Sequence, residues 1–412
     1  MTPRFKPALG WSEFFSLFKF NRGSVKMFEQ AFAQKFKAVD AVSFPYGRSA
    51  QWAFFKALGI EGAEVIMPSY TCSVVAHAVS LSGNTPRFVD IDLYDYNMNL
   101  DLAETLITPK TRAIIATHTF GYPQDLERLE SMVNEAEEKY GQKIWLIQDC
   151  CHAFGAEWKG RMVGTSGDVA VYAFNISKLM TSIFGGMLTF QNKDLAQKVR
   201  NWRDSNYHKP SLLKSLKRRL YLLVVFFAFY PTIYGLVWWI QSKTPFLNKL
   251  TKAYHLDNKI HFPPDYKDKM LGVEASVGLV QLRKYDRIIE SRRKKALWYD
   301  QNLERRKGWE FPPIINGATY SHYTVRVLDR EKVVNESAKR GLHLGTLIDY
   351  SIPELECYKT FGQNAILSFK VKNLTVNFPL QIENDFTAKF LSTIKLRCFA
   401  LIKSIANNIL PY

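Results

Sequence analysis

Short strand-like runs alternate with helical segments between residues 64 and 174, and this alternation constrains the fold more than any other feature. Five runs have the β-branched, aromatic and apolar residues of buried strands: EVIMPSY (64–70), TPRFVDID (85–92), RAIIATH (112–118), KIWLIQD (143–149) and DVAVYAF (168–174). The clearest helical segment, residues 124–140, lies between the third and fourth runs. This repetition predicts an α/β domain with a mainly parallel sheet, helices on both faces, and a ligand site at the carboxyl ends of the strands.

The last two runs belong to a stretch, residues 144–190, that holds the most informative residues. Asp149 ends one run, and Lys178 follows the next run shortly before the pair Gly185–Gly186. Pyridoxal phosphate chemistry needs this combination, because a lysine amine forms a Schiff base with the cofactor aldehyde and a carboxylate pairs with the pyridinium nitrogen. A lysine after a strand is more often a surface charge, so the two residues alone do not establish a function.

The order of features around these two residues resembles the DegT/StrS family of sugar aminotransferases. The matching sequence is Asp-Cys-Cys-His-Ala-Phe-Gly-Ala, then Gly-Thr-Ser-Gly-Asp, a strand, Ser-Lys and Gly-Gly. The resemblance covers most of residues 44–203 and, more loosely, residues 263–394. It implies a fold-type-I, pyridoxal-phosphate-dependent aminotransferase with a large, mainly parallel sheet domain and a smaller C-terminal α+β domain. It also implies a homodimer whose active sites are built from both subunits.

The resemblance assigns roles to individual residues. Lys178 would be the catalytic residue, Asp149 would pair with the pyridinium nitrogen, and His152 would contact the ring face or the phenolic oxygen. Cys72 stands where many relatives have an aromatic side chain that stacks on the ring, and Asn175 stands where a histidine is common. The full set of expected cofactor contacts is Gly47, Arg48, Ser49, Cys72, Asp149, His152, Asn175, Lys178 and Lys267.

The expected phosphate site departs from the family pattern. Gly47 precedes a predicted helix, where backbone N–H groups can hold a phosphate, and Arg48 and Ser49 follow it. Ala173 replaces a serine that usually binds the phosphate. Lys267 falls where the family has an asparagine that reaches the cofactor phosphate of the partner subunit, so it could replace the lost contact. The alternative for Lys267 is an ordinary solvated loop charge.

Residues 208–260 do not resemble the family. They contain 21 consecutive uncharged residues, Leu220 to Ile240, which is the length of a membrane-spanning helix. The basic residues just before this run are Lys214, Lys217, Arg218 and Arg219. A single crossing would separate Lys178 from the C-terminal domain, and Pro231 would bend a helix in mid-run. We therefore expect an in-plane or re-entrant anchor rather than a span, with a buried helical hairpin or a dimer contact as the alternative.

The distribution of charge supports the same expectation. The chain carries 55 basic and 38 acidic residues, a net charge of +17, and residues 208–260 contain nine of the bases and one acid. Cations beside an apolar segment favour an anionic membrane surface over nucleic acid. The five cysteines lack metal-type spacing, and Cys150 adjoins Cys151, so we expect a reducing cytoplasmic environment and no metal site.

These observations divide the chain into five parts: an N-terminal arm (1–40), a large cofactor-binding α/β domain (41–207), a basic hydrophobic insert (208–262), a long helix (277–302) with a small α+β domain (263–394), and a basic helical tail (395–412). The aromatic and basic arm either packs on the domain or contacts a membrane surface. The expected function is amino transfer from an amino acid, glutamate by the resemblance, to a nucleotide-linked or lipid-linked keto sugar. The pathway would be surface polysaccharide or glycoconjugate biosynthesis, on the cytoplasmic face of a membrane. The alternative is a non-catalytic membrane-associated scaffold that retains the fold.

Overall fold

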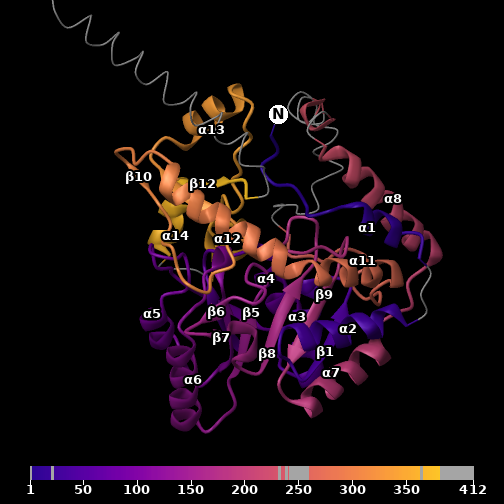
Figure 1. Cartoon of the computed structure of the whole chain (residues 1–412). Coiled ribbons are helices and arrows are strands. Elements are labelled where there is room, and N and C mark those ends of the chain that lie inside the picture. The colour runs from indigo at the N-terminus through magenta and orange to yellow at the C-terminus, as the bar shows by residue number, and fades with distance from the viewer. Residues whose placement is uncertain are drawn as a thin grey trace, which may run out of the picture.

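The computed structural model describes residues 2–19, 23–230, 233–236, 240, 259–361 and 365–380, and a seven-stranded sheet lies at its centre (Figure 1). The strands are arranged in the order β1-β9-β8-β5-β4-β2-β3. Their bounds are β1 (Asp40–Phe44), β2 (Glu64–Pro68), β3 (Thr85–Val89), β4 (Thr111–Thr117), β5 (Trp145–Asp149), β8 (Val169–Ala173) and β9 (Gly186–Phe190). Within this sheet β9 pairs antiparallel with β1 and β8, and the other pairs are parallel. The predicted mainly parallel sheet is confirmed.

Helices cover both faces of this sheet, because successive residues of each strand point to opposite faces and are apolar on both. In β1, Ala41 lies in one core cluster and Val42 lies in the other. The first cluster joins the sheet to α2 (Ser24–Lys35), α5 (Leu100–Thr105), α6 (Leu126–Tyr140) and α11 (Gly272–Arg283). The second joins it to α3 (Gly47–Leu58), α4 (Ser73–Leu81) and α7 (Lys193–Asn206).

Two helices differ from the expectation at their ends. Helix α3 begins at Gly47 with Tyr46 as its N-cap, so Gly47 is the first helical residue and does not precede the helix. The single helix expected over residues 277–302 is two helices, α11 and α12 (Tyr285–Asn302), which meet at Lys284 with φ −95° and ψ −2°. A break at this single residue does not interrupt the apolar periodicity, so the sequence pattern could not reveal it.

The smaller domain combines α12 with a three-stranded antiparallel sheet in the order β10-β11-β12. Its other elements and the β6-β7 hairpin have these bounds: β10 (Trp309–Glu310), β11 (Tyr323–Val327), β12 (Thr375–Phe378), α13 (Arg330–Lys339), α14 (Ile366–Val371), β6 (Glu157–Trp158) and β7 (Arg161–Met162). Tyr299 and Val325 share a buried cluster with Tyr70 and Phe120 of the large domain. This shared core holds the start of β11 against the strand ends of the large sheet.

The described part of the N-terminal arm packs on the large domain. Phe28 and Phe32 of α2 are fully buried in the core. The arm also contains α1 (Trp11–Ser16), which contacts α11 and α8 (Leu212–Ala228).

Helix α8 contains both the basic residues and the first part of the uncharged run. Its buried Leu222 and the neighbouring Leu17 and Val277 form one small cluster between the arm, α8 and α11. In the part of the chain that the structure describes, no helix combines the length and apolarity needed to cross a membrane. The expected bend at Pro231 and the tail at 395–412 lie outside the described residues.

Candidate active site

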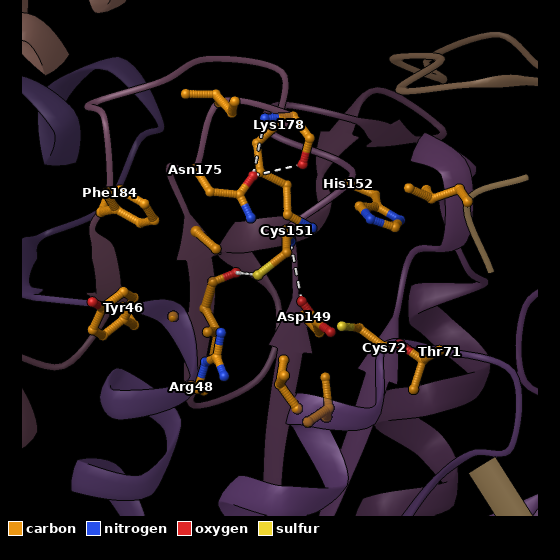
Figure 2. Close-up of a pocket in the computed structure, with 18 of the residues that line it drawn as sticks. Tyr46, Arg48, Thr71, Cys72, Asp149, Cys151, His152, Asn175, Lys178 and Phe184 are labelled. Carbon is orange, nitrogen blue, oxygen red and sulfur yellow. Dashed lines mark hydrogen bonds between the residues drawn. The ribbon is translucent and has the colours of Figure 1, made fainter. Parts of the chain in front are cut away.

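One cavity of about 580 Å³ lies at the carboxyl ends of the parallel strands and contains most of the predicted site residues. The predicted residues that line it are Gly47, Arg48, Cys72, Asp149, His152, Asn175 and Lys178. They lie at or after the ends of β1, β2, β5 and β8. Figure 2 shows the labelled side chains arranged around this shared space. The expectation that strand ends converge on one site therefore agrees with the structure.

Asp149 is the last residue of β5, and its carboxylate is held from two sides. Its Oδ1 accepts a hydrogen bond from the backbone N–H of Cys151 at 3.1 Å (Figure 2). Its Oδ2 accepts one from the Thr117 hydroxyl at 3.2 Å. The residue is only 4% exposed. Because a carboxylate has about four lone-pair sites, it can accept a further bond from a ring N–H in the cavity.

Lys178 lies in the loop between β8 and β9, and local bonds fix the shape of this loop. Its backbone N–H donates to the carbonyl of Asn175 at 3.1 Å, and the Asn175 side-chain oxygen accepts bonds from the N–H and hydroxyl of Ser177 at 3.1 and 2.7 Å. The loop ends at Gly186, where a Cβ would lie 2.4 Å from the carbonyl carbon of Tyr46. A glycine is therefore required for β9 to start beside the N-terminus of α3.

Two histidines lie near the lysine. Burial holds the pKa of His152 well below its usual range, and the positive charge of Lys178 lowers it further. Burial also lowers the pKa of His322 to about 3, with added repulsion from Arg292 and Lys178. The His152 ring stacks on Phe120 at a centroid distance of 6.2 Å. Both imidazoles are therefore neutral near pH 7, and His152 presents an aromatic face and a polar edge.

The first turn of α3 lies at the cavity and offers donors for an anion. The backbone N–H groups of Gly47, Arg48 and Ser49 are in the part of a helix that lacks intrahelical acceptors. A Cβ at Gly47 would lie 2.8 Å from the Cβ of Ala173, so glycine lets α3 start this close to β8. The Ser49 side chain does not line the cavity, and its buried hydroxyl has no hydrogen-bond partner among the described residues.

These features fit pyridoxal phosphate. The cavity joins an anion site, a buried carboxylate and a lysine, which are the groups that the phosphate, ring nitrogen and aldehyde of this cofactor require. The Nδ1 of His152 is buried without a hydrogen-bond partner among the described residues, so a polar group of a ligand could satisfy it.

Lys267 does not lie at the cavity of its own chain. Its Nζ lies 5.3 Å from the centroid of the Trp52 ring, and its carbonyl accepts a hydrogen bond from the backbone N–H of His208 at 2.8 Å. Its expected role concerns the cofactor of a partner subunit, and this role stays a prediction.

Helix α8 forms a wall of the cavity with Arg218 and Tyr221. From the sequence, these two residues were expected at a membrane segment. The Arg218 side chain is only 14% exposed. Its Nη2 donates to the Tyr46 hydroxyl at 2.7 Å and pairs with Asp265 at 3.0 Å, and its Nε lies 3.2 Å from Glu274. No local sequence pattern indicates this arrangement, because Asp265 lies 47 residues further along the chain.

The expected basic flank is therefore only partly available to lipid. Lys214, whose side chain is 12% exposed, pairs with Asp265 at 2.7 Å and with Asp268 at 2.9 Å. Two of the four cations before the uncharged run, Lys214 and Arg218, are thus buried in ion pairs instead of facing a membrane. Other lining residues that the sequence did not indicate are Arg4, Phe5, Gln51, His322, Gly345 and Asn377.

A large α/β domain with a lysine and an aspartate at its strand ends, joined to a small α+β domain, defines a fold-type-I pyridoxal phosphate protein. A family model described as the DegT/DnrJ/EryC1/StrS aminotransferase family matches residues 19–223 and 240–376. The chain belongs to this family, which depends on pyridoxal phosphate. The resemblance inferred from the sequence, the fold class and the cofactor are confirmed.

Curated relatives include two GDP-perosamine synthases. The one from Escherichia coli O157:H7 is 35% identical over 172 residues, which are 42% of this chain and 46% of the relative. The one from Caulobacter vibrioides is 28% identical over 279 residues, which are 68% of this chain and 61% of the relative. The match thus spans about half to three fifths of the length of these relatives.

Solved structures include the sugar aminotransferase CalS13 from Micromonospora echinospora, with a TM-score of 0.75. The two sequences are 22% identical, and the likeness covers 96% of this chain and 99% of CalS13. At this identity the comparison confirms the fold alone.

Proposed function

We propose that this protein is a pyridoxal-phosphate-dependent aminotransferase that moves an amino group from an amino acid to a keto sugar. The observation that supports it most is the convergence of Lys178, Asp149 and the first turn of α3 on one cavity. These residues come from segments far apart in the chain, and an aminotransferase needs all of them at one site.

Bound pyridoxal phosphate supplies an electrophilic aldehyde and a ring that withdraws electrons from the substrate carbon. The first turn of α3 would bind the phosphate, and Arg48 adds a positive charge at the same cavity. Asp149 would hold the ring nitrogen in its protonated form. Lys178 would hold the cofactor until the donor displaces it, and its freed Nζ would then move a proton from the donor's α-carbon to the aldehyde carbon of the cofactor. In the second half of the reaction, Nζ would move a proton in the reverse direction, to the acceptor carbon.

The proposal for the acceptor is supported by two relatives that are named GDP-perosamine synthase. We propose a keto sugar as acceptor and glutamate as donor, within surface polysaccharide or glycoconjugate biosynthesis. The keto sugar is nucleotide-linked or lipid-linked.

We further propose a homodimer in the cytoplasm in which Lys267 reaches the cofactor phosphate of the partner. Membrane association through residues 220–240 and the remaining basic residues is part of the same proposal. Light scattering of the purified protein measures the dimer, and Lys267→Ala should weaken cofactor binding without changing the mass.

The half-reaction with glutamate tests the function. Purified protein loaded with pyridoxal phosphate should lose its visible absorbance when glutamate is added and regain it with a keto sugar. A non-catalytic scaffold would give no change with any amino acid, and that result would reject the enzyme.

A further inference from the structure

Helix α8 is amphipathic, but its charged face lies against the protein and its apolar face is exposed. Its inner face carries the paired cations Lys214 and Arg218, and its outer face carries large apolar side chains. Leu216, Leu220 and Val224 are 61, 59 and 60% exposed, and their spacing of four residues places them on one stripe. A helix facing water normally shows the opposite arrangement.

Helix α1 shows the same reversal. Its buried Glu13 pairs with Lys284 at 2.8 Å, whereas Trp11 and Phe15 are 57 and 59% exposed. The two helices pack side by side (Figure 1), because the Phe226 ring of α8 lies 5.4 Å from Trp11 and 5.5 Å from Phe14. In α1 the charged Glu13 thus points inward, whereas Trp11 and Phe15 point outward.

The outer faces of these helices, with exposed residues that follow each helix in the chain, form one apolar surface, here called the α1–α8 surface. It consists of the exposed residues Trp11, Phe15, Phe18, Leu212, Leu213, Leu216, Leu220, Val224, Phe227, Tyr230, Ile233 and Leu236. Exposed Lys19 and Lys217 lie within or beside it. An apolar surface of this extent marks a site of interaction. Its cations would repel each other across an interface between two copies, whereas they attract an anionic bilayer.

The α1–α8 surface is continuous with the cavity. Tyr221 lines the cavity and lies one helical turn from Val224. Its ring packs on Phe184, another lining residue, at 5.2 Å. Arg4 and Phe5 of the N-terminal arm also line the cavity. The Phe5 ring lies 5.0 Å from the ring of Phe229, the residue that follows α8.

We propose that the acceptor is a keto sugar joined through phosphate to a long apolar lipid, and that the α1–α8 surface lies on the anionic bilayer that carries it. The sugar enters the cavity toward Lys178, Arg4 binds the phosphate, and the lipid stays on the apolar side of Tyr221. This inference rests on the proposed aminotransferase function and selects one of its two acceptor classes.

Binding to vesicles is the first test. The full chain, loaded with pyridoxal phosphate, is sedimented with vesicles of phosphatidylcholine and phosphatidylglycerol. The variant L216S/L220S/V224S should bind about tenfold or more weakly than the parent. The matched control L102S/L328S/I366S changes three exposed apolar residues elsewhere and should bind like the parent. Equal binding by parent and α8 variant, or a parent that does not bind, overturns the proposal.

The acceptor is tested with a panel of keto sugars, each as a nucleoside diphosphate and as a long-chain prenyl diphosphate in the same vesicles. The parent should use the prenyl form about tenfold or more faster, because anchoring raises the local acceptor concentration. The α8 variant should lose this advantage and keep the glutamate half-reaction. Arg4→Gln should raise KM for both diphosphate forms.

The outcomes separate the proposed aminotransferase function from the proposed lipid-linked acceptor. A parent without the glutamate half-reaction refutes the proposed function. A working half-reaction with a preference for nucleotide-linked acceptors refutes only the lipid-linked acceptor. Light scattering identifies the rival occupant: if the α8 variant becomes monomeric while the parent is dimeric, a second copy covers the surface and the proposal fails.

Discussion

The floor and the α8 wall of the cavity are built in opposite ways. On the floor, Asp149 and Lys178 stand at or just after strand ends. Their partners are the nearby Cys151 and Asn175 and, for Asp149, also Thr117 at the end of the adjacent strand β4. On the wall, Arg218 is buried by ion pairs with Asp265 and Glu274, which lie on a distant segment. The ion pairs of the wall hold α8 against the domain, whereas the floor groups are the ones to which we assign chemistry. Replacements on the two sides should therefore affect different properties.

Lys178→Ala should give the largest effect and act on chemistry alone. Without the amine, the cofactor has no covalent attachment and the donor's α-carbon has no base, so amino transfer should fall below detection. The glutamate half-reaction measures the loss, and thermal unfolding should remain close to that of the parent. Lys193→Ala, at an exposed position of α7, is the control. A variant with near-parental turnover would remove Lys178 from the site.

Asp149→Asn should lower the rate by roughly a thousandfold, because a neutral amide no longer keeps the ring nitrogen protonated. The asparagine Oδ1 can still accept from the Cys151 N–H, and its Nδ2 can donate to the Thr117 hydroxyl, so stability should change little. Single-turnover kinetics with glutamate measures the effect, with Asp125→Asn at the N-cap of α6 as a matched control. An unchanged rate would mean that another acid pairs with the ring.

Arg218→Met should act on stability, in contrast to the two floor variants. It leaves Glu274, which is 1% exposed, without its counter-ion, and loss of one partner of a buried pair costs about 3–5 kcal/mol. Urea unfolding measures the free energy, and the exposed Arg305→Met is the control. If Arg218→Met lowered the half-reaction while stability stayed parental, the distinction between floor and wall would be wrong.

Glu274, the partner of Arg218 at the same wall, should make the free energy of unfolding depend on pH. This effect should be smaller than that of Arg218→Met. Burial raises the pKa of Glu274 from its usual 4.5 to about 7, and this outweighs the attraction of Arg218. The folded state then binds more protons than the unfolded state between these pKa values. Stability from this group is complete below pH 4.5 and is lost as the pH rises through about 7.

The difference between the two pKa values corresponds to about 3 kcal/mol. Glu274→Gln should flatten the fall in unfolding free energy across this pH range, while keeping the acceptor for the Leu271 N–H. Urea unfolding at several pH values measures the slope. A slope as steep as that of the parent would assign the pH dependence to other groups.

Most of the floor could be predicted from the sequence. Strand patterning is a local property, and the carboxyl ends of parallel strands meet at one edge, so Asp149, Cys72 and Lys178 could be placed together before any coordinates. Ser49 could not be placed as well, because a shift of three residues in the start of α3 decides which side chains face the cavity. The helix break at Lys284 was also missed, since one residue leaves no mark on the periodicity.

The sequence by itself determined the α/β architecture, the family and the lysine and aspartate of the floor, because these depend on short-range pattern and on residue identity. Only the tertiary structure decided whether the charges in α8 pair with acids of the protein or face outward. A run of cations before an uncharged segment has the same composition whether the cations face lipid or distant acids. The acids at 265–274 bury Lys214 and Arg218 and turn the leucines outward, and such pairing between remote segments is a property of the folded chain.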